Sequence, residues 1–208
     1  MNPILDQLIE SYPRLTNCRE EIYSSFLSLK TTFQEGGSIY ILGNGGSASD
    51  ALHIVGELMK SFTKKRRLSE EFITSFRDNE LDINIDKLQG ALPAYALVEN
   101  SSLSTAYGND VDWEYSFAQQ VYGYVTSSDL VWGISTSGNS KNIINALKVA
   151  KLKGAKTLGL SGRDGGNMKA FCDDIIIAPE FETYKIQELH LPIYHALCKM
   201  LENYFWKE

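Results

Sequence analysis

The stretch YILGNGGSASDALH, residues 40–53, carries the strongest signal for the fold of this 208-residue chain. An apolar run ends in a turn that contains three glycines, and a helical pattern with two serines and a histidine follows. Gly43, Gly45 and Ala48 match the G-x-G-x-x-G/A pattern of a strand, a tight turn and a helix that bind a dinucleotide. Three interpretations are open: a dinucleotide fingerprint, a cradle for another phosphate, and a plain turn with Ser47 as the helix cap.

The dinucleotide interpretation needs a second strand that ends in an acidic residue about 20 residues further on. This chain has SFTKKRRLSEEF there, residues 61–72, which is basic and polar and favours a helix. The glycine turn still offers free backbone N–H groups at a helix N-terminus, with the hydroxyls of Ser47 and Ser49 beside them. Hydrogen bonds and the helix dipole both favour an anion at such a position. The pattern therefore fits a phosphate cradle better than a dinucleotide site.

Outside this stretch, short apolar runs alternate with amphipathic helical patterns. Runs typical of buried strands occupy residues 38–43, 94–99, 129–135, 156–162 and 173–179. Helical patterns occupy about 47–62, 113–126, 138–153 and 185–205. The alternation predicts an α/β fold for residues 36–208, a doubly wound parallel five-stranded sheet flanked by helices. Residues 1–35 are expected to add a helical segment to the same domain, broken near Pro13.

The composition argues against several classes of protein. The chain has no stretch of 18 apolar residues and no basic, then apolar, leader, so we expect a cytoplasmic protein without a membrane partner. Cys18, Cys172 and Cys198 are scattered and odd in number, which disfavours disulfides and thiolate zinc sites. A net charge of −6 disfavours nucleic acid as a partner. We interpret the basic patch KKRR, residues 64–67, as a solvated helix end.

A second polar turn, STSGNSKNI at residues 135–143, also lies between an apolar run and an amphipathic helix. Four hydroxyl side chains crowd it: Ser135, Thr136, Ser137 and Ser140. One such side chain is enough to cap a helix, and Gly138 allows a ligand to approach the backbone closely. The lysine of a P-loop is missing. The turn therefore predicts a cradle for a phosphomonoester on a small molecule.

Six motifs in order resemble the sugar isomerase (SIS) domain, and within it the sedoheptulose 7-phosphate isomerase (phosphoheptose isomerase) family. They are GNGGS (43–47), D-A-x-H-x-x-x-E-L (50–58), GND (108–110), GISTSGNS (133–140), DGG (164–166) and I-Q-E-x-H (186–190). The resemblance covers about residues 1–62 and 93–206. It implies a flavodoxin-like SIS fold. It also implies an isomerase that converts sedoheptulose 7-phosphate to glycero-manno-heptose 7-phosphate through an enediol, the first step towards activated heptose for lipopolysaccharide, capsule or S-layer glycan.

Titratable residues decide whether the cradle belongs to an enzyme. His53 and Glu57 are four residues apart, which puts them on one helix face, an arrangement that an ordinary surface contact also explains. Gln187 and His195 are eight apart, about 12 Å of helical rise. Pro192 between them is expected to kink the helix or to place Gln187 near its start. The resemblance implies that all four gather in the active site and can bind zinc, with Glu57 and His195 as catalytic base and acid.

The resemblance further implies the contacts to the substrate. Phosphate binding falls to Ser47, Ser135, Thr136, Ser137 and Ser140, and the remaining substrate contacts to Asn44, Gly45, Asn109, Asp110 and Gln187. Turn chemistry explains Asn109 and Asp110 equally well, and we interpret His190 as a packing or supporting residue. Nitrogen and oxygen ligands suit zinc better than magnesium. A Glu57 bound to metal is less free to act as a base, and the metal's role, catalytic or structural, is left open.

The chain departs from shorter members of the family by an expected helical insertion at about residues 66–92, a lid or an oligomer contact. Lys185 stands where an arginine is common. We expect a symmetric homo-oligomer, because one chain's Gln187 and His195 cannot easily both reach one helix face. The resemblance implies that it is a tetramer with active sites between subunits. The alternatives are a monomer with a helix bent at Pro192, an isomerase for a hexulose phosphate, and a non-catalytic SIS protein that binds a sugar phosphate or a replication-initiator partner.

Overall fold

The computed structural model describes residues 2–79 and 82–207 and contains a five-stranded sheet. All neighbouring strands are parallel and their order is β2-β1-β3-β4-β5. This is the flavodoxin-like order, so the predicted fold class is confirmed. The strands are β1 (Ile39–Gly43), β2 (Ala94–Ala96), β3 (Leu130–Ser135), β4 (Lys156–Gly162) and β5 (Asp174–Ala178).

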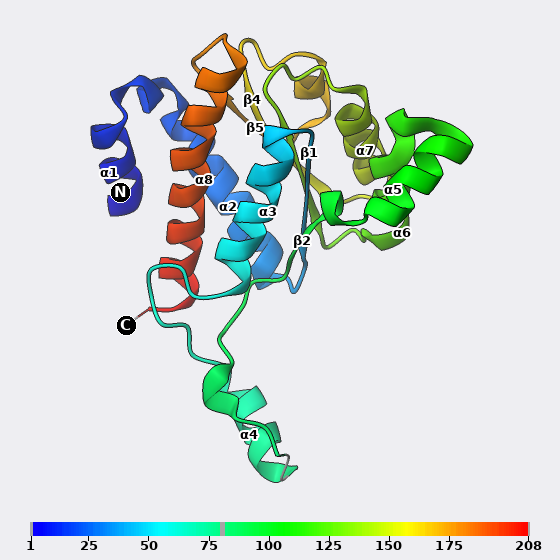
Figure 1. Ribbon diagram of the computed structural model, residues 1–208. Coiled ribbons are helices and arrows are strands. Elements are labelled where there is room, and N and C mark those ends of the chain that lie inside the picture. Colours follow the sequence, from blue (N-terminus) through cyan, green and yellow to red (C-terminus); the bar gives the residue numbers. More distant parts are fainter. Residues whose placement is uncertain (1, 80–81, 208) are drawn as a thin grey trace.

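Helices cover both faces of this sheet (Figure 1). One layer holds α1 (Pro3–Ser11), α2 (Arg19–Gln34), α3 (Gly46–Met59) and α8 (Thr183–Phe205). The other holds α5 (Ser101–Tyr107), α6 (Ser116–Tyr124) and α7 (Lys141–Leu152). In β1, Ile39 and Ile41 join the first apolar core and Leu42 the second. A strand buried on both faces reads as a continuous apolar run, which is why the strands were detectable in the sequence.

Two elements differ from the prediction, and a third settles an alternative that the sequence left open. α5 was not predicted, because SSLSTAY is rich in serine and threonine, which compete with a helix by bonding to their own backbone. β2 has three residues instead of the expected six. α8 continues through Pro192, and its start at Thr183 places Gln187 in the second turn. Of the two outcomes expected from this proline, the structure shows the second.

The order of the strands reverses direction at β1, which creates a topological switch point in the sheet. From β1 the chain moves outward to β2 on one side and then crosses to β3 on the other side of β1. The carboxyl ends of β1 and β3 therefore lie next to each other, and the connections that leave them go to opposite faces. Open α/β sheets bind their ligands in the crevice at this place. The glycine turn follows β1 and the serine-rich turn follows β3.

The basic patch KKRR does not form a solvated helix end, which corrects that interpretation. Residues 65–69 form no helix, and the side chain of Arg66 is fully buried. Its guanidinium donates to Glu202 Oε1 at 2.8 Å and to the carbonyl oxygens of Glu57 and Leu58 at 2.7 and 2.5 Å. Arg66 therefore caps the C-terminal end of α3 and ties it to α8.

Glu202, the partner of Arg66 on α8, is also fully buried and accepts four further hydrogen bonds from the loop after α3. The donors are the backbone N–H groups of Phe62, Thr63 and Lys64 and the Thr63 hydroxyl. Burial alone would raise the pKa of Glu202, but these bonds and Arg66 together lower it below its ordinary value. The carboxylate therefore stays charged at neutral pH and joins the ends of two helices.

The insertion at residues 66–92 projects away from the sheet (Figure 1). It contains α4 (Glu70–Asp78), capped by the hydroxyl of Ser69, and a short turn at Ile85–Lys87. The structure describes all nine residues of α4, and none of them is buried. Its two ends meet, because the N–H of Gly90 donates to the carbonyl of Arg66 at 3.1 Å. Over the described ranges, no helix is long and apolar enough to cross a membrane.

We predict that Arg66→Met lowers the free energy of unfolding by about 3–5 kcal/mol, because the buried charge of Glu202 loses its partner. Chemical denaturation with urea measures the loss. Arg67→Met is the matched control: the side chain next along the chain is exposed, and its loss should change stability by about 0.5 kcal/mol or less. The double variant Arg66→Met/Glu202→Leu should be more stable than Arg66→Met alone. Equal effects of the two arginine variants would contradict this assignment.

Candidate active site

Three of the predicted metal ligands lie together on two helices of one chain. One possible ligand atom each from His53, Glu57 and His195 lies within 4.8 Å of the others. His53 Nε2 is 3.2 Å from Glu57 Oε1 and 3.4 Å from His195 Nε2. α3 supplies the first two residues and α8 the third, and the two helices run side by side in the same direction. These three residues therefore meet within one chain, and whether a second chain adds to the site stays a prediction.

The donor set of this cluster suits a metal ion of the zinc type. Two imidazole nitrogens and one carboxylate converge, which matches a zinc site with three protein ligands and an open position. Glu57 Oε2 is buried, has no hydrogen-bond partner among the described residues, and lies 3.6 Å from Lys60 Nζ. Burial and then the neighbouring His53 lower the pKa of His195, so its ring is neutral at pH 7 and can offer a lone pair.

Gln187, the fourth predicted ligand, lies elsewhere on the same pair of helices. A Cβ atom added to Gly46 would stand 2.2 Å from Gln187 Nε2, so the amide packs directly on the first residue of α3. Gly46 precedes His53 by seven positions, about 10 Å of helical rise. The structure thus places the Gln187 amide at the glycine turn.

The glycine turn leaves the first turn of α3 open to an anion. The residue before α3 is Gly45, with φ +55°, and no side chain caps the N-terminus, all of which the structure describes. Ser47 is buried inside the first turn. The interpretation of a plain turn capped by Ser47 is therefore wrong. The N–H groups of Ser47 and Ala48 donate to the carbonyl oxygens of Asn44 and Gly45 at 3.0 Å, and the dipole of α3 favours an anion such as phosphate at this end.

The serine-rich turn has the same character at α7. Ser140 precedes α7 but makes no side-chain cap, and its hydroxyl lies 3.0 Å from the hydroxyl of Ser135. Thr136 and Ser137 are half-buried beside them, and the Ser137 hydroxyl accepts from the N–H of Asn139 at 3.2 Å. The hydroxyls thus stand near a second uncapped helix N-terminus, which the plain capping role does not require.

Further contacts hold the two turns in place. Asn44 and Asn142 exchange two side-chain hydrogen bonds of 2.9 and 3.0 Å, which join the glycine turn to the start of α7. Gly138, with φ +64°, packs against the DGG motif: a Cβ there would stand 2.0 Å from the carbonyl oxygen of Gly165. The DGG motif therefore supports the serine-rich turn from behind.

The other predicted residues lie outside the cluster. Asn109 and Asp110 are exposed in a π-helical turn, Gly108–Asp112, where the Asn109 amide donates to the Asp110 carboxylate at 2.9 Å. His190 is fully buried, and its Nε2 lies 3.1 Å from the carbonyl oxygen of Ser161, which confirms its packing role. Lys185 pairs with Glu182 at the surface, at 3.2 Å.

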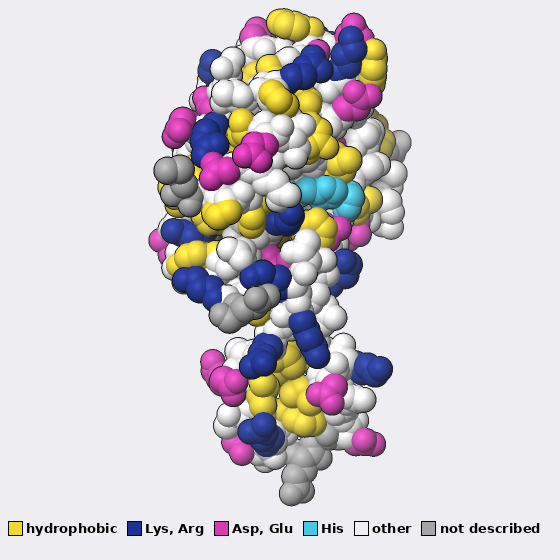
Figure 2. Space-filling model, turned by 90° about the vertical axis from the view of Figure 1, so that its left-hand side faces the viewer, with side chains coloured by type: hydrophobic (Ala, Val, Ile, Leu, Met, Phe, Trp, Pro, Cys, Tyr) yellow, Lys and Arg dark blue, Asp and Glu magenta, His cyan; other side chains and the backbone are white. Residues whose placement is uncertain are grey.

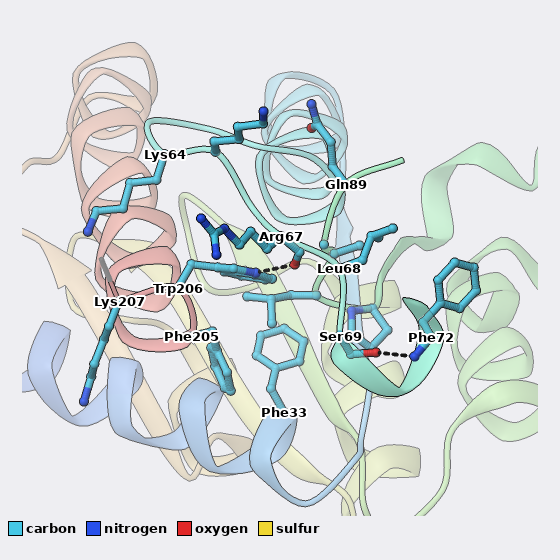
Figure 3. Close-up of a pocket in the computed structure, with 15 residues that line it drawn as sticks. Phe33, Lys64, Arg67, Leu68, Ser69, Phe72, Gln89, Phe205, Trp206 and Lys207 are labelled. Carbon is cyan, nitrogen blue, oxygen red and sulfur yellow. Dashed lines mark hydrogen bonds between the residues drawn. The ribbon is translucent and has the colours of Figure 1, made fainter. Parts of the chain in front are cut away.

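A hollow of about 1100 Å³ lies between the base of the insertion and the C-terminal end of α8, and none of the predicted site residues lines it (Figure 3). Among the described residues its charged lining is basic throughout: Lys64, Lys65, Arg67 and Lys207. His195 borders a smaller hollow of about 370 Å³ between α1 and α8. Figure 2 shows histidine side chains at the surface of this face, and the insertion projects away from them.

This chain combines a doubly wound parallel sheet with an uncapped glycine turn after β1 and a serine-rich turn after β3. These features place it in the class of SIS domains, and the SIS domain model matches residues 106–203. More specifically, the chain belongs to the phosphoheptose isomerase family. It is 39% identical to the phosphoheptose isomerase of Nitratiruptor sp. over 187 residues, 90% of this chain and 88% of the relative. For the enzyme of Aliarcobacter butzleri the identity is 40%, over 83% of this chain and 79% of the relative.

Solved structures agree with this assignment. The phosphoheptose isomerase from Neisseria gonorrhoeae superimposes on 96% of this chain and 91% of its own, with a TM-score of 0.73 and 30% identity. The likeness thus extends over both helical layers and the sheet, including the N-terminal helices that lie outside the matched SIS segment.

We predict that His190 makes stability depend on pH. Burial lowers the pKa of His190 from 6.5 to about 4, so the folded protein keeps it neutral while the unfolded chain takes up a proton below about pH 6.5. Stability should fall as the pH drops from 6.5 towards 4 and level off below, by on the order of 3 kcal/mol from this residue. His190→Gln keeps a side-chain amide for Ser161 and cannot titrate. Parallel pH profiles of urea unfolding for the two proteins would contradict the assignment.

Proposed function

We propose that this protein is a phosphoheptose isomerase that interconverts sedoheptulose 7-phosphate and glycero-manno-heptose 7-phosphate. The names of its relatives support this reaction. The observation that carries the proposal is the convergence of Glu57, His53 and His195 on the same helix pair as an uncapped, anion-favouring helix N-terminus. About 10 Å of helix separates the two ends of this arrangement, a span that suits an extended sugar phosphate.

The phosphate group would bind at the N-termini of α3 and α7. Backbone N–H groups and the hydroxyls of Ser137 and Ser140 are uncharged donors, and two helix dipoles stabilise the negative charge. The reciprocal bonds between Asn44 and Asn142 keep the two termini at a constant separation. The phosphate then orients the sugar along α3, with its carbonyl end towards the cluster.

Proton transfer would follow at that end. Glu57 Oε1 lies beside His53, so its buried Oε2, 3.6 Å from Lys60 Nζ, is the oxygen left to take the proton from C1 and return it to C2. A neutral His195 can move a proton between the two oxygens of the enediol. A zinc ion held by His53, Glu57 and His195 would polarise the substrate oxygens.

We also propose a cytoplasmic homo-oligomer, a tetramer, as its working form. The support is that four large apolar side chains on α3, on α8 and directly after α1 are exposed: Tyr12 at 42%, Leu52 at 42%, Met59 at 45% and Leu191 at 41%. Because His53, Glu57 and His195 meet within one chain, a neighbouring subunit would cover this cluster and would not need to supply its members. Light scattering at the assay concentration measures the mass.

The reaction itself is tested with sedoheptulose 7-phosphate and NMR of the phosphorylated products, with and without added zinc. An aldose 7-phosphate product supports the proposal. Binding without turnover in either condition would indicate a non-catalytic SIS protein instead. Turnover of a hexulose phosphate in place of the heptulose would indicate an isomerase of another specificity on the same fold.

We predict that Ser137→Ala/Ser140→Ala raises KM for the sugar phosphate by about tenfold or more, because each lost hydrogen bond to a charged group costs about 1.5–3 kcal/mol. Stability should change by about 1 kcal/mol or less, since neither hydroxyl caps α7. Ser127→Ala is the control, because Ser127 is exposed and lies before the amino end of β3, away from the serine-rich turn at its carboxyl end. An unchanged KM in the double variant would reject the cradle.

We predict that Glu57→Gln folds and binds the substrate but loses kcat by a factor of about 10²–10⁴, the usual contribution of a general base. Near-normal kcat would remove Glu57 from this role. Mixed oligomers of Glu57→Gln and His195→Ala subunits should stay inactive, because both residues serve the same chain's cluster. Rescue in such mixtures would show that a neighbouring chain supplies one of them.

A further inference from the structure

A buried tyrosine and an aspartate stand behind His53, on the side away from Glu57. Tyr194, on α8, is 1% exposed, and its hydroxyl lies 3.0 Å from His53 Nδ1 and 3.3 Å from Asp50 Oδ1. Asp50 precedes His53 by one helical turn on α3. The rings of His53 and Tyr194 meet edge to face, with centroids 5.5 Å apart. Asp50 opens the motif D-A-x-H-x-x-x-E-L but was given no role from the sequence, and Tyr194 was not singled out.

The hydrogen-bond directions in this group follow from the number of available protons. As a carboxylate Asp50 only accepts, so the Tyr194 hydroxyl donates its single proton to Asp50 Oδ1, although burial raises the pKa of Asp50. The Tyr194 oxygen is then free to accept from His53 Nδ1, in competition with Glu57 Oε1, which lies 3.2 Å from His53 Nε2. The bond to Tyr194 places the ring proton on Nδ1. The lone pair of His53 is left on Nε2, the atom that faces Glu57 and His195.

We propose that Asp50 and Tyr194 are positioning residues that hold His53 in the Nδ1–H tautomer with its Nε2 lone pair aimed at the Glu57–His195 cluster. The proposal deepens the proposed function, because it assigns His53 as a ligand of that site. A histidine ligand is oriented by the bond that its other nitrogen makes, and partners of this kind set metal affinity. Here the partner comes from α8, so the same bonds also hold α3 and α8 in register at the cluster.

A role in stability alone explains the contacts of Asp50, Tyr194 and His53 less well. Asp50 Oδ2 is buried and has no hydrogen-bond partner among the described residues, so Tyr194 supplies the only side-chain bond recorded for this carboxylate. An unsatisfied buried oxygen is destabilising, which a group kept for stability alone would avoid. The direction of the bonds, from histidine to tyrosine to carboxylate, serves the lone pair on Nε2 instead.

The first test reads the His53 tautomer directly in metal-free protein. Nitrogen-15 NMR of the histidine rings, at a pH where they are neutral, distinguishes Nδ1–H from Nε2–H. We expect Nδ1–H in the wild type and a shift towards Nε2–H in Tyr194→Phe, which keeps the ring and removes only the hydroxyl. Tyr204→Phe is the matched control, because this tyrosine lies on the same helix and its hydroxyl bonds only to Gln34 among the described residues. An Nε2–H wild type, or an unchanged tautomer in Tyr194→Phe, overturns the proposal.

The second test measures zinc affinity by competition with a chelator. Tyr194→Phe should bind Zn²⁺ about 10- to 100-fold more weakly than wild type, and Tyr204→Phe should bind it equally well. Asp50→Asn provides a second route to the same result if Tyr194→Phe does not fold. Equal affinities in wild type and folded Tyr194→Phe would overturn the role in metal binding. The tautomer measurement needs neither metal nor substrate, so a protein that fails to isomerise sedoheptulose 7-phosphate still tests this inference separately.

Discussion

The parallel packing of α3 on α8 is the contact on which the site depends. At the first turn of α3, Gly46 lets Gln187 approach the backbone. In the middle of α3, His53 contacts His195 and Tyr194 of α8. At the end of α3, Arg66 joins this helix to Glu202 of α8. Three different kinds of interaction thus keep one register. A shift of either helix by one residue, about 1.5 Å along the axis, would separate the ligand atoms of the cluster.

This register also explains which parts of the site could be predicted. His53 and Glu57 lie on one helix, and their spacing alone puts them on one face. The rise of about 12 Å between Gln187 and His195 was also correct, but the inference from it was incomplete. α3 is long enough to meet each residue at a different turn, so one chain accommodates both: Gln187 at Gly46 and His195 at His53.

The fold could be predicted from the sequence more completely than the residues that support the site, for a physical reason. Strands buried on both faces leave apolar runs, and tight turns require glycine, so β1, β3 and their turns are visible in the sequence. Burial of Arg66 and the contact between Asp50 and Tyr194 depend on helices that meet only in three dimensions. A basic run such as KKRR looks the same whether its third residue is solvated or pairs with a distant glutamate.

The closed base of the insertion has a consequence for how this family can vary. The Gly90 to Arg66 bond brings the two ends of the segment together, and Arg66 anchors that base in the core. The entropy of closing a loop rises only slowly with its length, by about 0.6 kcal/mol for each doubling. Because the helix it carries buries nothing, chain length here is nearly neutral for folding. Evolution can therefore lengthen or shorten this arm while the helix pair beneath it keeps its register.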